Sequence, residues 1–372
     1  MKDGTMRLVI LAVTCLALFT TLPVKGGEFN DKLSVGDAAP SWEKLPGTDG
    51  KEHALADFAD KDAIVSFTGL AFSPDGRRLF LSNVNGSIKV FAVDAEGTLT
   101  PAHSLLLPAA AAPRRRDEIP AGLAVSADGT RLYVCGNLSN QLLELDSQTG
   151  AVLRKWAVGV APYDVVLVNN RAYVSNWGGR RPGADDLVGP AGRGTTVRVD
   201  PVRFVAKEGS VSIIHLDPSG NGSSPDAELL TGLHASALAV APKGRWVVCA
   251  NAAADTLSVI DTRTEQVVET IWARAKPSDL LGAGPNALAF APDGRTLYVA
   301  NGSQNAVGVI HFDPQGRKSK LTGLIPVGWY PGALLHDAAR HQLIVANIKG
   351  LPERTKASPT GPATWSMLWS VC

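Results

Sequence analysis

Cysteine and histidine are the residue types that most often carry covalent or metal chemistry, and here they are widely dispersed. Cys15 lies in an apolar N-terminal run, whereas Cys135 and Cys249 fall at equivalent points of two similar segments. No two cysteines have the C-x-x-C spacing of a redox or zinc motif. We therefore expect Cys135 and Cys249 to be buried free thiols, too far apart for a disulfide.

The histidines show no metal-ligand spacing either, and no serine stands in the nucleophile elbow of a hydrolase. We expect loop or strand-edge positions for them, no metal site and no cofactor. The scattered histidines are His103, His215, His311, His336 and His341.

One stretch, residues 177–209, combines Trp177 with a small excess of positive charge. It is able to hold an anionic ligand or cover a partner domain, but we favour a solvated loop whose arginines pair with its own aspartates. Its charged residues are Arg180, Arg181, Arg193, Arg198, Arg203 and Lys207 against Asp185, Asp186, Asp200 and Glu208.

The composition limits the classes of partner. Lys and Arg number 36 against 35 Asp and Glu, so there is no overall pull toward nucleic acid or anionic lipid. The run Arg114 to Arg116 is followed at once by Asp117 and Glu118, and no aromatic platform accompanies it. A hydrophobic fraction of 45% supports a large core and excludes a disordered or collagen-like chain.

A repeat positions these residues. Six segments share an apolar strand, a tight turn that is Asp-Gly in the clearest copies, and a second strand ending in Asn, at intervals of roughly 40–75 residues. A further strand pair follows each Asn, so each unit has four strands. The sequence therefore predicts an all-β protein, a β-propeller of four-stranded blades with six repeats seen and six or seven blades. The segments end at Asn83, Asn137, Asn176, Asn251, Asn301 and Asn347.

Particular residues carry a family resemblance. Tyr173-Val-Ser-Asn and Tyr298-Val-Ala-Asn, with Ser73-Pro-Asp-Gly, resemble the repeats of YVTN-type (YncE-like) β-propellers. Gly284-Pro-Asn-Ala and Gly328-Trp-Tyr-Pro resemble the propeller half of bacterial proteins that join such a propeller to a phosphoesterase of the alkaline-phosphatase superfamily. The resemblance covers residues 67–350 and implies a seven-bladed, exported propeller.

Ligands of propellers usually bind where the inner strands begin, around the central channel, and the aligned repeats place one residue of each unit there. Asp164 is the one carboxylate found at this mouth, whereas a hard divalent cation takes six or more ligands. For the recurring Asn and for Trp329 and Tyr330 we favour structural roles in turns and between blades. The candidate ligand-binding residues are Tyr163, Asp164, Asn176, Trp177, Arg180, Arg181, His234, Asn286, Trp329 and Tyr330.

The two ends depart from the repeat. Residues 1–26 read as a signal peptide, which predicts a periplasmic or secreted protein without a membrane span after cleavage. Residues 27–66 are a redoxin-like remnant, since the overlapping segment 33–68 resembles the start of a thioredoxin-like redoxin domain that lacks its reactive cysteine. Residues 351–372 are a tail. A strand within 364–371 and another within 62–67 are predicted to complete the last blade.

These observations lead to three hypotheses. The first is an exported, monomeric, non-catalytic propeller that binds a small ligand or a protein domain at the channel face. The second is a propeller lactonase-like, metal-dependent hydrolase that uses Asp164, Asn286 and their neighbours. The third is a redoxin-like oxidoreductase, which the missing cysteine disfavours.

Overall fold

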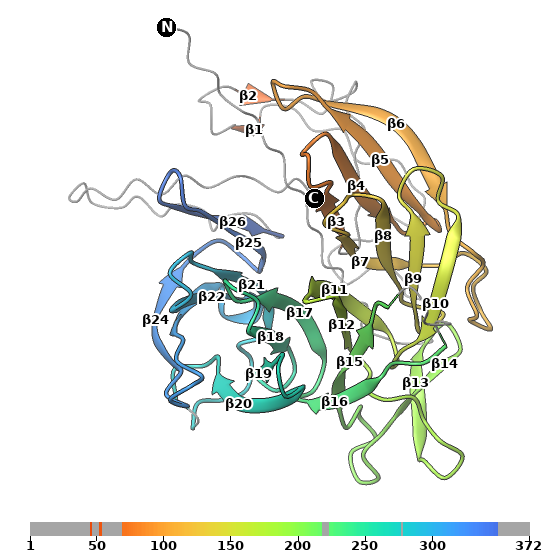
Figure 1. The fold of residues 1–372 in the computed structure, drawn as a ribbon. Helices are drawn as coiled ribbons and strands as arrows, with labels where there is room; N and C mark the ends of the chain where they lie inside the picture. Colours follow the sequence, from red (N-terminus) through yellow and green to blue (C-terminus); the bar gives the residue numbers. More distant parts are fainter. Residues whose placement is uncertain (1–44, 47–51, 54–68, 218–222, 277, 349–372) are drawn as a thin grey trace, which may run out of the picture. The chain divides into compact units, whose positions relative to one another are not determined.

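The computed structural model describes residues 45–46, 52–53, 69–217, 223–276 and 278–348 (Figure 1). The described strands belong to two units. The unit Cys15–Val65 contains an antiparallel pair, β1 (Leu45–Pro46) and β2 (Glu52–His53), and all other described strands belong to the unit that continues from Ser66. No α-helix occurs among the described residues, and within them no helix is long and apolar enough to cross a membrane.

The second unit consists of successive antiparallel sheets, which we number as blades 1 to 6 in chain order. Blades 1 to 5 have four strands, and the two described strands of blade 6 are β25 (Pro331–Asp337) and β26 (Gln342–Asn347). This architecture confirms the predicted all-β propeller class. The other blades are β3 (Leu70–Phe72), β4 (Arg78–Asn83), β5 (Ser87–Val93) and β6 (Leu99–Leu106); β7 (Pro120–Val125), β8 (Arg131–Gly136), β9 (Gln141–Asp146) and β10 (Val152–Ala157); β11 (Pro162–Val168), β12 (Arg171–Asn176), β15 (Gly209–His215) and β16 (Ala227–Thr231); β17 (Ala235–Val240), β18 (Trp246–Asn251), β19 (Thr256–Asp261) and β20 (Gln266–Trp272); and β21 (Pro285–Phe290), β22 (Thr296–Asn301), β23 (Ala306–His311) and β24 (Lys320–Pro326).

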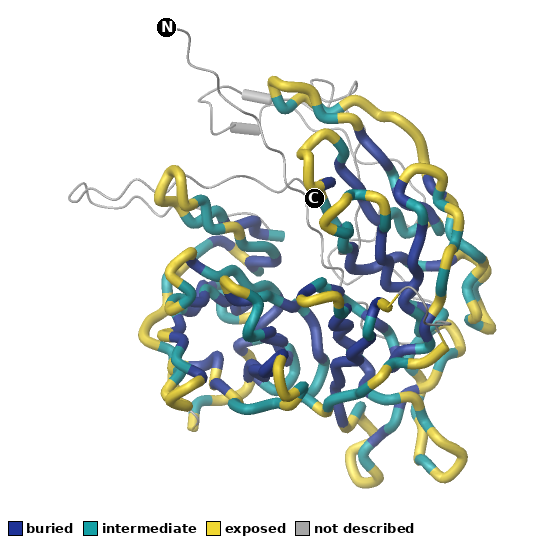
Figure 2. Tube along the Cα trace, in the orientation of Figure 1, coloured by how far each residue is buried: buried dark blue, intermediate teal, exposed yellow. Residues whose placement is uncertain are grey.

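The hydrophobic core lies between neighbouring blades. The inner strands β3, β7, β11, β17, β21 and β25 contact one another in that order, and each of the four largest apolar clusters joins two successive blades. The cluster between blades 2 and 3, for example, contains Tyr133, Trp156 and Ile214. In Figure 2 the middle strands of the blades are buried and the turns are exposed. Because both faces of a blade are covered, its central strands are apolar on both sides.

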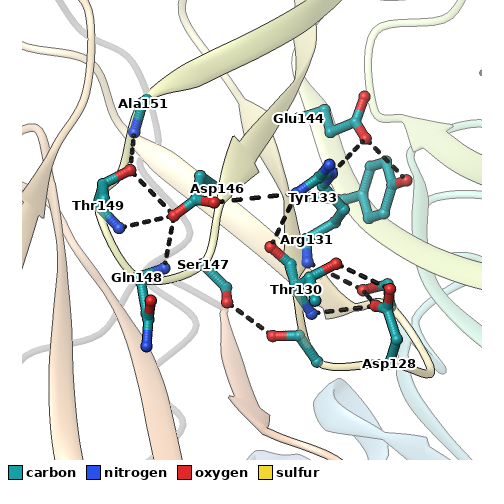
Figure 3. A network of polar contacts seen from close by, with 12 residues as sticks. Asp128, Thr130, Arg131, Tyr133, Glu144, Asp146, Ser147, Gln148, Thr149 and Ala151 are labelled. Carbon is teal, nitrogen blue, oxygen red and sulfur yellow. Dashed lines mark hydrogen bonds and ion pairs between the residues drawn. The ribbon is translucent and has the colours of Figure 1, made fainter.

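The Asp-Gly turn of blade 2 shows why this dipeptide recurs (Figure 3). Gly129 has a φ of 73°, which a residue with a Cβ seldom adopts. The carboxylate of Asp128 accepts hydrogen bonds from the Ser126 hydroxyl and from the backbone N–H of Thr130. These bonds lower the pKa of Asp128 to about 2, so the turn is held by a charged group at neutral pH.

A second recurring pair explains the Gly residues that precede the inner strands. A Cβ on Gly159 would lie 2.6 Å from Cγ of Asn176, and one on Gly232 would lie 2.8 Å from Cγ of Asn251. The amide Nδ2 of Asn176 donates to the hydroxyls of Ser210 and Ser212 on the third strand of the blade. In blades 1, 3 and 4 the recurring Asn thus ties the second strand to the third, and in blades 3 and 4 the glycine makes room for it. In blade 5 Nδ2 of Asn301 donates instead to the carbonyl oxygen of Ala273 and to Oε1 of Gln304.

Blade 2 differs from the prediction. Its second strand ends at Gly136, the residue that pairs with Pro120 as Asn176 pairs with Pro162, so Asn137 lies one residue beyond the aligned position. Glu118, which is 2% exposed, occupies the space beside Gly136. Its carboxylate accepts the backbone N–H groups of Leu138 and Ser139. A carboxylate from the preceding loop therefore replaces the asparagine of the other blades.

Blade 3 carries the insertion predicted at residues 177–209. It forms an antiparallel hairpin of β13 (Val188–Gly192) and β14 (Thr195–Arg198) between the second and third strands of the blade. The signal peptide, most of the redoxin-like segment, the C-terminal tail and the two strands proposed to complete the last blade lie outside the described residues, and they stay predictions.

Candidate functional site

We call the end of the blades where the inner strands begin the mouth. In four blades the residue before the inner strand has a positive φ: Ala161 (53°), His234 (56°), Gly284 (60°) and Tyr330 (54°). The carbonyl oxygen of each accepts the N–H of the residue that follows the recurring Asn. Left-handed backbone is uncommon for large side chains, so His234 and Tyr330 are held in place at some cost in free energy.

Asp164 is the charged residue that stands out on the inner strands. The equivalent positions of the other described blades hold small residues, namely Gly69, Gly122, Ala237, Ala287 and Ala333. The carboxylate of Asp164 accepts the backbone N–H of Val165 at 2.8 Å and that of Leu238, in the next blade, at 2.9 Å. Burial disfavours the charged form more than these bonds favour it, and it raises the pKa of Asp164 to about 6.

Trp177 and His234 lie together across the boundary between blades 3 and 4. Their rings are stacked, with centroids 3.7 Å apart and planes inclined by 15°. Burial lowers the pKa of His234 to about 4, because the imidazolium would lose its hydration against the indole. The imidazole is therefore neutral at physiological pH and forms part of an aromatic surface at the mouth.

Arg180 and Arg181 already have partners within the chain. The guanidinium of Arg180 binds both carboxylate oxygens of Glu208, at 3.1 and 2.9 Å, and that of Arg181 donates to the backbone carbonyls of Val158 and Asn140. Further ion pairs join Arg198 and Lys207 to Asp186, and Arg203 to Asp200. The insertion thus neutralises most of its own charge, as the interpretation of a self-paired loop expected.

The other candidates divide into two groups. Asn176 is fully buried and bonds to the third strand of its own blade, and Tyr163, the second residue of β11, is half-buried. Asn286 and Tyr330 meet at Gly302, between blades 5 and 6, where a Cβ would lie 2.5 Å from Nδ2 of Asn286 and 3.0 Å from Cζ of Tyr330. Trp329 beside them is 52% exposed. The structure thus pairs Asn286 with Tyr330, and Trp177 with His234.

The described residues do not provide a cluster for a divalent cation. Among them no group of three or more His, Cys, Asp or Glu side chains is placed to hold a metal ion. The carboxylate of Asp164 is engaged with backbone N–H groups, and its aligned neighbours carry no oxygen ligand. Cys135 and Cys249 are buried free thiols, and burial raises the pKa of both well above the ordinary value.

Sequence reasoning gave no site role to three carboxylates near this end of the blades, of which Glu118 and Glu208 are buried and Glu228 is half-buried. Glu118 replaces the asparagine of blade 2, and Glu208 binds Arg180. Glu228 accepts the hydroxyl of Ser210 at 2.6 Å, and burial raises its pKa. Each lies in a loop or outer strand where the repeat pattern is weakest. For Glu118, the glycine at the end of the second strand of blade 2 is the signal that would have indicated it.

Comparison with known proteins finds one family model that matches part of the chain. The model of the family described as lactonase, 7-bladed β-propeller, matches residues 221–328, which span blades 4 and 5 and contain both His234 and Asn286. No curated protein matches the chain.

Two crystal structures of candidate 6-phosphogluconolactonases are similar in fold. The one from Bacteroides fragilis has 14% sequence identity and a TM-score of 0.53, and the alignment covers 79% of this chain and 78% of that one. The one from Bacteroides uniformis has 14% identity and a TM-score of 0.51, with 77% and 78% covered. At these identities the likeness concerns the fold.

Proposed function

We propose that this protein is a lactonase-like propeller hydrolase whose reaction centre lies at the mouth around Asp164. The observation that carries the proposal is the carboxylate of Asp164, with a pKa of about 6, at an inner-strand position that is Gly or Ala in the other described blades. A general base works best when its pKa lies near the operating pH. The match to the lactonase family model supports hydrolysis better than the non-catalytic docking module of the first hypothesis.

In this proposal the Asp164 carboxylate removes a proton from a water molecule, whose oxygen attacks the lactone carbonyl carbon. The ring C–O bond then breaks, and the alkoxide that leaves takes the proton back from Asp164, which yields the hydroxy acid and regenerates the carboxylate. The two backbone N–H groups that bind Asp164 fix the orientation of its carboxyl group. No step is assigned to a metal ion, because the described residues do not offer its ligands.

Trp177 and His234 serve as the binding surface in the same proposal. A stacked, neutral pair presents a flat apolar face at the mouth without a charge that would have to be desolvated. The paired arginines of the insertion hold that loop next to it. Kinship with YVTN-type propellers and export through residues 1–26 belong to the proposal as well; mass spectrometry of the mature N-terminus tests the export.

The test is lactone hydrolysis by the purified full chain, followed by titration of the acid released. We use D-glucono-δ-lactone, its 6-phosphate and γ-butyrolactone, and compare the chain with Asp164→Asn and with Asp94→Asn, an exposed turn aspartate, as matched control. We expect hydrolysis of at least one lactone, unchanged in D94N and reduced about 10²- to 10⁴-fold in D164N. Hydrolysis that is equal in all three proteins, or absent from all of them, would refute the proposal and favour the non-catalytic propeller of the first hypothesis.

A further inference from the structure

Asn286 is the described side chain with the least satisfied hydrogen-bonding capacity. The residue is 7% exposed, and neither Nδ2 nor Oδ1 of its amide has a partner among the described residues. An amide supplies two donors and one acceptor oxygen, and leaving them all unpaired away from water is unfavourable. Such a group in a native fold calls for an explanation, and an absent ligand is one of the recognised ones.

The architecture of the blade does not require an amide at this position. The equivalent residues of blades 2, 3, 4 and 6 are Ala121, Tyr163, Ser236 and Gly332. The Ser236 hydroxyl donates to the carbonyl oxygen of Ala250 in its own blade and, at 3.4 Å, to that of Pro285 in blade 5. Asn286 makes no such bond.

Asn286 also differs from the recurring asparagines that end the second strands. In Asn176 and Asn251 only Oδ1 lacks a partner, since Nδ2 binds hydroxyls of the third strand. An unpaired Oδ1 also occurs at Asn301 and Asn347, so it belongs to the repeat. The unpaired Nδ2 of Asn286 belongs to blade 5 alone among the described blades.

The surroundings of Asn286 are those of a recognition site. The ring of Tyr330 and the amide of Asn286 both lie where a side chain on Gly302 would project, so this position admits no side chain without displacing one of them. The backbone N–H of Tyr330 donates to Oδ1 of Asn305, which fixes the chain that carries the ring. Trp329, next in sequence, is half exposed and adds apolar surface.

We propose that Asn286, Gly302 and Tyr330 form a second binding site, between blades 5 and 6, that takes the amide group of an apolar ligand. A primary carboxamide offers a donor and an acceptor side by side, which is the complement of the two atoms that Asn286 leaves unpaired. The face of the phenol ring packs against the planar amide, and Trp329 against the apolar part. Because neither amide atom of Asn286 contacts solvent, the half-buried Tyr330 ring turns aside when the ligand enters.

The site goes beyond the proposed lactonase activity and does not depend on it. It lies between blades 5 and 6, whereas Asp164 bonds to Leu238 across blades 3 and 4. The test therefore measures binding instead of turnover. The probes are the primary amide hexanamide and the methyl ketone 2-heptanone, which share one shape and differ in the NH₂ group, and calorimetry with the full chain gives both dissociation constants.

We expect the wild-type chain to bind the primary amide about tenfold more tightly than the ketone, the effect of one well-formed hydrogen bond. Asn286→Ala removes this preference, whereas Asn85→Ala, at an exposed turn, retains it. Asp164→Asn, which is designed to abolish hydrolysis, leaves amide binding unchanged, so the two proposals fail separately. Equal binding of the two probes by the wild type, or an amide preference that survives in N286A with an unchanged melting temperature, would overturn the inference.

Discussion

The pH dependence of hydrolysis is the sharpest consequence of the environment of Asp164. With a pKa of about 6, its carboxyl group is about nine-tenths ionised at pH 7, half ionised at pH 6 and about one-tenth ionised at pH 5. If the carboxylate is the general base, kcat/KM is expected to follow this fraction, with an apparent pKa near 6 and a tenfold loss per pH unit below about pH 5. His234 does not produce this profile, because its pKa is about 4.

The same shift sets the stability of the Asp164→Asn variant. The pKa in the fold lies about two units above the ordinary value of 3.8, so ionisation costs roughly 3 kcal/mol of folding free energy. The cost is absent below about pH 4, grows as the pH rises through 6, and is complete above that. Asparagine avoids it but gives up an acceptor for the N–H of Val165 or Leu238, worth about 1–3 kcal/mol.

The two effects nearly cancel, so D164N is expected to melt within a few degrees of the wild type at pH 7 while its hydrolysis falls at least a hundredfold. The assay is initial-rate titration of a lactone between pH 4.5 and 8, with calorimetric melting of both proteins in the same buffers. A flat wild-type profile, or an apparent pKa near 4, would refute the assignment of Asp164 as the base.

Two further predictions concern stability. Gly159→Ala places a Cβ 2.5 Å from a backbone oxygen and is expected to lower the free energy of unfolding by about 1–3 kcal/mol. Gly323→Ala, with nothing within 4 Å of the added atom, is the control and leaves the midpoint of urea unfolding unchanged. Equal midpoints for the two variants would contradict the packing argument. Glu144→Ala removes the buried partner of Arg154 and is expected to lower the melting temperature by about 5–10 °C. The control Glu96→Ala, at an exposed position, is expected to change it little. A drop no larger than in the control would show that the ion pair does not stabilise the fold.

The fold was predictable because its repeated parts are local. A tight turn such as Ser126 to Gly129 is fixed by residues next to each other in the chain, so the pattern of the sequence reports it directly. The predicted end of the second strand of blade 2 was wrong by one residue, because Asn137 stands directly after Gly136 and resembles the recurring Asn. The structure corrects this, because it places the carboxylate of Glu118 beside Gly136.

The sequence was sufficient to name candidate residues, but not to predict which of them are in contact. The position of Asp164 on an inner strand followed from the alignment, but its bond to Leu238 joins two blades and has no signature in the sequence. The stack of Trp177 on His234 likewise joins an insertion to the start of the following blade. Contacts between blades depend on how the sheets pack, and that packing decides which residues of the list meet.

The contact between Gly159 and Asn176, and its counterpart at Gly232 and Asn251, constrains how these blades are able to evolve. A larger residue at the glycine is compatible only with a smaller one at the end of the second strand. Blade 2 shows that exchange completed, since Gly136 stands in the asparagine position and the loop before its inner strand supplies Glu118 instead. In an alignment of relatives the two columns should therefore change together, and a blade transplanted into another propeller has to carry both members of the pair.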